Sequence, residues 1–171
     1  MPTDGRSAET TRVLVVADTH LPAKRADEIV ERLGAHLAAA DLILHAGDVT
    51  DAAVLERLGE FAPVHAVLGN NDDLDLPETL EVEVAGVAVA MIHDSGTAKG
   101  RGSRLARLFP AADVVVFGHS HLPWNETRDG DGRPQIHFNP GSPTQRRRAP
   151  TRTVGWLEIV GGVARASIVD V

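Results

Sequence analysis

The chain contains no cysteine among its 171 residues. Disulfides, thiolate zinc sites and cysteine nucleophiles are therefore excluded, and any metal ion must be held by imidazole, carboxylate, amide or backbone oxygen. The chain also lacks a long apolar run, since none approaches the roughly 18 residues of a membrane span. The first ten residues, MPTDGRSAET, are polar. We therefore expect a cytoplasmic protein that has no membrane partner.

The composition indicates one globular domain. Hydrophobic residues make up 43% of the chain and charged residues 24%, which is enough apolar material for a core. We expect a single domain over residues 1–171, with residues 1–11 as a flexible leader. The formal net charge of -7 argues against nucleic acid as a partner. The basic run QRRRAP, which holds Arg146, Arg147 and Arg148, is interpreted first as a solvated loop.

The first half of the chain alternates strands and helices. A continuous apolar run from Val13 to Ala17 predicts a strand buried on both faces, and LILHAGD and VHAVLG predict two more. The segments ADEIVERLGAHLA and DAAVLERLGEF have helical periodicity, and Thr50 is the expected N-cap of the second helix. The residues expected on their apolar faces are Ile29, Val30, Leu33, Leu37, Val54, Leu55 and Leu58. This order is typical of an α/β fold.

The second half is richer in strands. TLEVEVAGVAVAMIH predicts a hairpin that turns at Ala85-Gly86, and WLEIVGGVARASIVDV predicts another at Gly161-Gly162. Between them we expect a short helix that is capped by Ser103 and ended by Pro110, and then the strand DVVVF. The apolar face of that helix is expected to comprise Leu105, Leu108 and Phe109. The pattern predicts two packed sheets flanked by helices.

Polar residues follow five of the apolar runs. Because ligands bind outside the carboxyl ends of strands in α/β sheets, we expect these residues to converge at one edge. Three of the sets contain a glycine, which permits a sharp departure from the strand. The five sets are Asp18-Thr19-His20, Gly47-Asp48, Gly69-Asn70-Asn71-Asp72, His93-Asp94 and Gly118-His119-Ser120-His121.

Converged, these sets offer carboxylate, amide and imidazole groups, which are more ligands than one tetrahedral ion takes. Two ions are therefore the natural number. In two-metal sites, ions about 3.5–4 Å apart clamp a phosphoryl group and activate a shared water. The sequence thus favours a two-metal phosphoester hydrolase.

This series of motifs resembles the calcineurin-like metallophosphoesterase family, and specifically its small single-domain bacterial and archaeal phosphodiesterases. NPGS at 139–142 and the closing hairpin are also similar. The resemblance implies an α/β fold, a four-layer αββα sandwich of two mixed sheets flanked by helices. It also implies two divalent ions, with Mn²⁺ expected first and Fe, Zn²⁺, Co²⁺ or Ni²⁺ as alternatives. The implied ligands are Asp18, His20 and His121 for one ion, Asn70, His93 and His119 for the other, and Asp48 between them.

The resulting hypothesis is hydrolysis of a small phosphodiester by attack of a hydroxide that bridges the ions. The expected catalytic residues are Asp48, Asn70 and His119. Asn70, Asn71 and Arg101 are expected to contact the substrate, and the planar guanidinium of Arg101 suits phosphate.

The sequence departs from the family pattern at two positions. Much of the family has a histidine, which helps to protonate the leaving group, where this chain has Asn71. Because an amide is no general acid near neutral pH, we expect a preference for good leaving groups. Asp94 stands where glycine is common, which affects the expected turn more than the ligand. Asp72 either orients a neighbour or has a capping or solvent role.

The remaining histidines are expected to have structural roles. His36 falls in a predicted helix and His65 and His137 in predicted strands, so we expect surface or core positions. His45 stands three residues before Asp48, so we expect it to support a ligand.

Two other functions stay open from the sequence. A scaffold for protein assembly is one, because the retromer scaffold subunit resembles the same family. The complete set of ligands favours chemistry over this alternative. A nuclease that uses Arg146, Arg147 and Arg148 is the other, and the acidic net charge argues against it. If the chain associates, we expect a homodimer.

Overall fold

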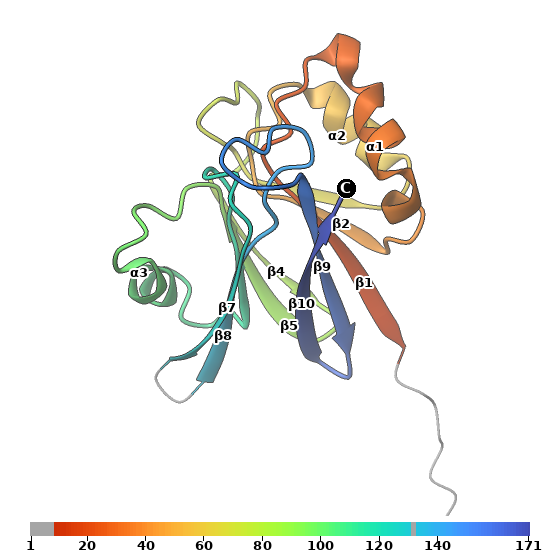
Figure 1. The fold of residues 1–171 in the computed structure, drawn as a ribbon. Coiled ribbons are helices and arrows are strands. Elements are labelled where there is room, and N and C mark those ends of the chain that lie inside the picture. The colour runs from red at the N-terminus through yellow and green to blue at the C-terminus, as the bar shows by residue number, and fades with distance from the viewer. Residues whose placement is uncertain (1–8, 131–132) are drawn as a thin grey trace, which may run out of the picture.

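The fold contains two five-stranded sheets (Figure 1). It was analysed as a computed structural model, which describes residues 9–130 and 133–171. The first sheet has the strand order β10-β9-β1-β2-β3, in which β1 pairs in parallel with β2 and antiparallel with β9. Its strands are β1 Thr10–Val16, β2 Leu42–His45, β3 Val64–Ala66, β9 Thr153–Val160 and β10 Val163–Asp170.

The second sheet has the order β4-β5-β6-β8-β7 and is also mixed. The β4–β5 hairpin turns at Ala85 and Gly86, which both have positive φ, and this confirms the predicted turn. The turn at Gly161 and Gly162 between β9 and β10 is confirmed in the same way. The strands are β4 Thr79–Val84, β5 Val87–Ile92, β6 Val114–Val116, β7 Trp124–Gly130 and β8 Arg133–Asn139.

The helices are α1 Asp27–Leu37, α2 Ala52–Gly59 and α3 Arg101–Leu108, with a short 3-10 turn at Ala23–Arg25. The two predicted caps are wrong. The N-cap of α2 is Asp51, whose carboxylate accepts from the Ala53 amide, because Thr50 has a left-handed backbone (φ 72°). α3 begins after Gly100, so Ser103 lies within it.

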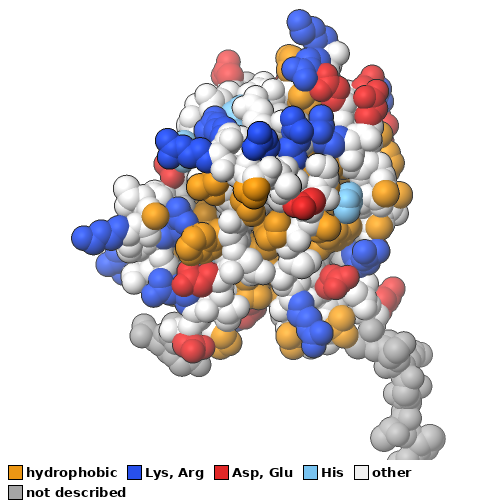
Figure 2. Space-filling model, in the orientation of Figure 1, with side chains coloured by type: hydrophobic (Ala, Val, Ile, Leu, Met, Phe, Trp, Pro, Cys, Tyr) orange, Lys and Arg blue, Asp and Glu red, His pale blue; other side chains and the backbone are white. Residues whose placement is uncertain are grey.

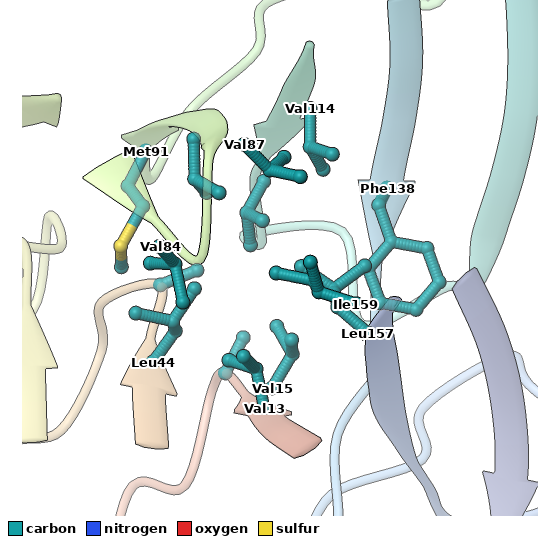
Figure 3. Close-up of a cluster of buried hydrophobic side chains, with 14 of the residues drawn as sticks. Val13, Val15, Leu44, Val84, Val87, Met91, Val114, Phe138, Leu157 and Ile159 are labelled. Atoms are coloured by element: carbon teal, nitrogen blue, oxygen red, sulfur yellow. The ribbon is translucent and has the colours of Figure 1, made fainter. Parts of the chain in front are cut away.

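Three apolar clusters define four layers, which confirms the αββα sandwich. The largest fills the space between the sheets, where side chains of β1 and β9 meet those of β5, β6 and β8 (Figure 3). A second joins α1 and α2 to the outer face of the first sheet through residues such as Leu14 and Leu33. A third joins α3 to the outer face of the second sheet through Leu105, Phe109 and Phe117. Leu108 was expected on this face, but it is 53% exposed.

The expected leader is too long at its C-terminal end. β1 begins at Thr10 rather than at Val13, because residues 10–12 pair with β9 at the edge of the sandwich. Residues 1–8 lie outside the described part of the chain. Within the part that the structure describes, no helix has the length and apolarity needed to cross a bilayer.

The two leucines of α3 provide a test of this layer. Leu105→Ala should lower the free energy of unfolding by about 2–5 kcal/mol, because it empties a fully buried position. Leu108→Ala makes the same change at an exposed position and should cost less than about 0.5 kcal/mol. Urea denaturation followed by circular dichroism measures both. Equal losses in the two variants would contradict the placement of α3.

Candidate metal centre

The polar residues that follow the strands gather into two groups. Asp18 and His20 follow β1 and meet His121, which follows β6, with ligating atoms all within 4.8 Å of one another. Asp48 follows β2 and meets His93 and His119, again within 4.8 Å. The groups form because parallel β1 and β2 end at one edge, and so do parallel β5 and β6.

Asp48 lies between the two groups. Its Oδ2 atom is 3.4 Å from the Nε2 atom of His20 in one group and 3.4 Å from the Nε2 atom of His93 in the other. One carboxylate oxygen thus faces a ligand of each group. A carboxylate so placed is able to contact two cations.

Asn70 completes the second group. Its Oδ1 atom lies 3.0 Å from His93 Nε2 and 2.9 Å from His119 Nδ1. In the first group, His20 and His121 stack with ring centroids 5.1 Å apart and their Nε2 atoms separated by 3.3 Å. The structure therefore brings together all seven residues that the sequence suggests as metal ligands.

The hydrogen atoms of two of these histidines point away from the centre. His93 donates from Nδ1 to the Ala46 carbonyl at 2.7 Å, and His121 donates from Nδ1 to the Gln145 carbonyl at 2.5 Å. Since a carbonyl only accepts, Nδ1 carries the proton and the Nε2 lone pair of each neutral ring faces inward. The lone pair of His93 meets Asn70 Oδ1 and Asp48 Oδ2, which also only accept.

The carboxyl group of Asp18 also lacks hydrogen-bond donors in the described part of the chain. It is fully buried, and neither of its carboxylate oxygens has a hydrogen-bond partner among residues 9–130 and 133–171. A buried carboxylate without partners is costly unless a cation compensates it. Nitrogen and oxygen donors of this kind suit Mn²⁺, Fe, Zn²⁺, Co²⁺ and Ni²⁺, so the residues fit a divalent metal.

Strained backbone conformations coincide with these residues. Five of the seven have a left-handed φ, although none of them is glycine: Asp18 (55°), His20 (47°), Asp48 (57°), His119 (69°) and His121 (59°). Such conformations cost of the order of 1 kcal/mol each and gather at functional sites. They turn successive side chains from the strand ends toward the same point.

Two glycines allow the strand ends to approach. A Cβ atom on Gly69 would lie 2.1 Å from the Asp48 amide nitrogen, and one on Gly47 would lie 2.7 Å from His93 Nδ1. Any side chain at either position would displace a residue of the site.

Asn71 and Asp72 hold Asp48 in place. Asn71 donates from its backbone amide to Asp48 Oδ1 (2.9 Å) and from its side chain to Oδ2 (2.7 Å). Burial, the largest single cause, would raise the pKa of Asp48, but the net shift is downward, and the two bonds from Asn71 are the largest causes of the lowering. Asp72 accepts from the backbone amides of Asp48, Thr50 and Gly69, so of its two expected roles it orients the neighbouring loop.

His45 supports the site from behind. It is fully buried, and burial lowers its pKa to about 3. Its Nδ1 atom accepts from the Gly47 amide, so Nε2 carries the proton and donates to the hydroxyl of Thr19 at 3.1 Å. One neutral imidazole thereby connects the loops after β1 and β2.

Sequence reasoning missed the loop that follows β8. Its hydroxyls hold the turn after β1, since Ser142 donates to the Asp18 carbonyl (2.8 Å) and Thr144 to the Thr19 carbonyl (2.7 Å). Asn139 donates to the Gly118 carbonyl at 2.9 Å and fixes the turn after β6. The NPGS motif was the available signal, but spacing alone does not reveal these partners.

Basic side chains gather over the same loop in the upper part of Figure 2. The guanidinium of Arg146 donates to the Ala149 carbonyl at 3.0 Å. Arg147 is exposed and has a left-handed backbone (φ 48°). Burial is the main cause of the shifted pKa values of Asp18, His20 and His121, and the positive charge of Arg147 lowers all three. The positive charge of Arg147 therefore acts on the first group of ligands.

Arg101 is the predicted site residue with the least direct link to the centre. Its guanidinium lies over the rings of Phe117 (5.1 Å) and Trp124 (5.5 Å), at the start of α3. Asp94 is exposed and accepts from the Gly96 amide, which forms a local turn.

The other histidines lie outside the two groups, as expected. His36 on α1 accepts from the Trp156 indole, and His65 lies in β3. His137 is buried in β8 and bonded to Gln135.

The protonation of Asp18 generates a testable result. Burial, reinforced by the charge of Asp48, raises the pKa of Asp18 to about 8, so at pH 7 the metal-free carboxyl is mostly protonated. A cation binds the carboxylate, so binding should release close to one proton from Asp18 at pH 7. Calorimetric titration with Mn²⁺ in buffers of different ionisation enthalpy measures the number released.

Asp18→Asn is the matched variant, because it keeps an oxygen ligand but carries no titratable proton. It should release about one proton fewer at pH 7 than the unaltered protein. Asp48, whose pKa is lowered, is already ionised and contributes none. Equal proton release in the two proteins would disprove a protonated Asp18.

Comparison with known proteins connects this geometry to a family. Residues 11–162 match the calcineurin-like phosphoesterase superfamily domain. A probable metallophosphoesterase of Methanocaldococcus jannaschii is 36% identical over 154 residues, which are 88% of this chain and 77% of that protein.

Solved structures share the fold. An archaeal phosphodiesterase superposes with a TM-score of 0.66 at 18% identity, over 93% of this chain and 100% of the other. Vps29 of Entamoeba histolytica in complex with Zn²⁺ superposes with a TM-score of 0.67 at 23% identity, over 94% and 99%. The resemblance seen in the sequence is confirmed, and the chain belongs to the calcineurin-like phosphoesterase superfamily.

Proposed function

We propose that this protein is a metal-dependent phosphodiesterase that hydrolyses a small phosphodiester with the help of two divalent ions. The observation that carries the proposal is two groups of ligating atoms, joined by Asp48, in which the ring hydrogens of His93 and His121 point outward. Such a set is repulsive by itself and is stabilised by cations.

The two groups divide the ligands between the ions. Asp18, His20 and His121 would hold one ion, Asn70, His93 and His119 the other, and Asp48 would contact both. When bound, such ions polarise a phosphoryl group and lower the pKa of water to about 7. Mn²⁺ stays the first choice among the metals that this ligand set suits.

The residues around the ligands favour a diester with a good leaving group. Asn71 uses its amide to hold Asp48, and an amide delivers no proton near pH 7. Asp48 and His119 act by fixing the charge and position of the centre. Asn70, Arg101 and Arg147 are the residues proposed to meet the phosphoryl oxygens.

A cytoplasmic location and a homodimer stay predictions from the sequence. The nuclease hypothesis loses support from Arg146, whose guanidinium is bonded to the carbonyls of its own loop. Protein assembly remains as the contrasting outcome of the activity test.

Removal of the shared carboxylate tests the proposal. Asp48→Asn should reduce kcat/KM for an activated aryl phosphodiester by at least the roughly 100-fold that the loss of a group supporting a metal ligand costs. The assay uses protein stripped of metal and resupplied with Mn²⁺, and calorimetry counts the ions bound per chain. The matching aryl monoester shows whether diesters are preferred.

Asp73→Asn is the control, because Asp73 is exposed in the neighbouring loop after β3 and the change is the same. It should leave kcat/KM unaltered. A protein that binds two ions per chain but does not hydrolyse either ester would contradict the proposal and favour protein assembly.

Arg147 gives a second test. Arg147→Ala should raise KM for the diester about 10-fold with little change in kcat, if its charge contributes equally to binding substrate and transition state. Arg148→Ala removes the next exposed arginine of the same loop and should change neither value. Initial rates over a range of diester concentrations separate the two parameters. An equal effect of both substitutions would indicate only a general attraction of anions.

A further inference from the structure

A polar cavity lies away from the metal centre. It has a volume of about 430 Å³ and lies between α3 and the outer face of the β7–β8 pair. Its lining includes Gly102 and Ser103 at the start of α3, and Arg128 and His137 from the two strands. Figure 2 shows Lys and Arg side chains around this part of the molecule. No residue of the metal centre lines it.

His137 lines this cavity and has an unused acceptor buried beneath the cavity wall. Gln135 donates its amide to the carbonyls of Phe109 (2.8 Å) and Ala112 (2.9 Å), so its Oε1 atom must accept from His137 Nε2 at 2.7 Å. His137 Nδ1 therefore carries a lone pair. The side chain is 1% exposed, and Nδ1 has no hydrogen-bond partner in the described residues. A buried acceptor of this kind calls for a donor.

The start of α3 presents unused donors. The backbone amides of Gly102 and Ser103 have no hydrogen-bond partner within residues 9–130 and 133–171. Free amides at a helix N-terminus attract anions.

Two cations add to this attraction. The guanidinium of Arg128 packs on the first turn of α3, since a Cβ atom on Gly102 would lie 1.9 Å from its Nη1 atom. Arg107 lines the cavity one turn further along the helix, and Asp129 is the one carboxylate among the lining residues.

We propose that this cavity binds a small phosphorylated alcohol, with its phosphoryl group at the free amides of α3 between Arg107 and Arg128, and with a hydroxyl that donates to His137 Nδ1. A phosphoryl group has several oxygens that accept from amides and guanidinium groups at once. The neighbouring hydroxyl supplies the donor that His137 lacks.

Two phosphonates of nearly equal size test this site. Hydroxymethylphosphonate carries the hydroxyl, whereas ethylphosphonate carries a methyl group in its place, and neither has an ester bond to hydrolyse. We expect hydroxymethylphosphonate to bind about 10-fold more tightly, because only its hydroxyl satisfies the buried acceptor. Nuclear magnetic resonance of the full chain loaded with diamagnetic Zn²⁺ would follow the amides of Gly102 and Ser103 and the ring nitrogens of His137.

Binding at the metal centre is distinguished by its own signals, those of His93 and His119. The cavity signals should move at the same concentrations after the ions are removed, so the result does not depend on the proposed hydrolysis. Signals at the cavity that stay fixed through the millimolar range would overturn the proposal, and the cavity would then hold solvent alone.

Substitutions separate the two recognition elements. Arg107→Ala changes an exposed side chain and should weaken both phosphonates about 10-fold, whereas Arg32→Ala, an exposed arginine on α1, should weaken neither. His137→Phe should abolish the preference for the hydroxyl. Equal effects of the two arginine substitutions, or a preference that survives in His137→Phe, would also overturn the proposal.

Discussion

Mutual repulsion among acceptor atoms is the constraint on which the centre of this protein depends. The strands deliver carboxylate oxygens, an amide oxygen and imidazole lone pairs to one small volume, and the metal-free chain relieves part of their repulsion by protonating Asp18. Hydrogen bonds from residues around the centre hold the ligands in place against that repulsion. The carbonyls of Ala46 and Gln145 orient two rings, and Asn71 and Asp72 hold the loop of Asp48. The fold therefore holds in place a cluster that becomes favourable only when cations bind.

The packed sandwich offsets the backbone strain of the residues in the metal centre. Five left-handed backbone conformations together cost several kcal/mol, of the order of 1 kcal/mol for each residue. They persist because the strands that precede them are buried on both faces, so the strand ends cannot relax without disturbing the packing between the layers. Gly69 and Gly47 remove the side chains that would keep those ends apart. The rigid packing of the strands therefore maintains the strained backbone of the residues that follow them.

Sequence reasoning succeeded where a feature is local or where topology determines it. Strand order places Asp18, Asp48 and His119 at one edge, and alternation along the chain reveals both hairpins. It failed where the role of a residue depends on tertiary contacts. Thr50 and Asp51 are both good caps by residue type, and the left-handed turn at Thr50 decides between them. The orientation of Asn71 depends on Asp48, 23 residues away along the chain, which no spacing reveals.

The hydroxyl of Ser142 reaches the carbonyl of Asp18 across 124 positions of the chain, and His20 meets His121 across 101. During synthesis, the first ligands leave the ribosome long before the residues that orient them. A nascent chain that ends before β8 and its loop has Asp18 and His20 but lacks Ser142 and Thr144, whose hydroxyls hold the turn after β1. Because contacts between distant residues form late in folding, an ion would find both proposed groups of ligands oriented only after β8 and its loop have been made.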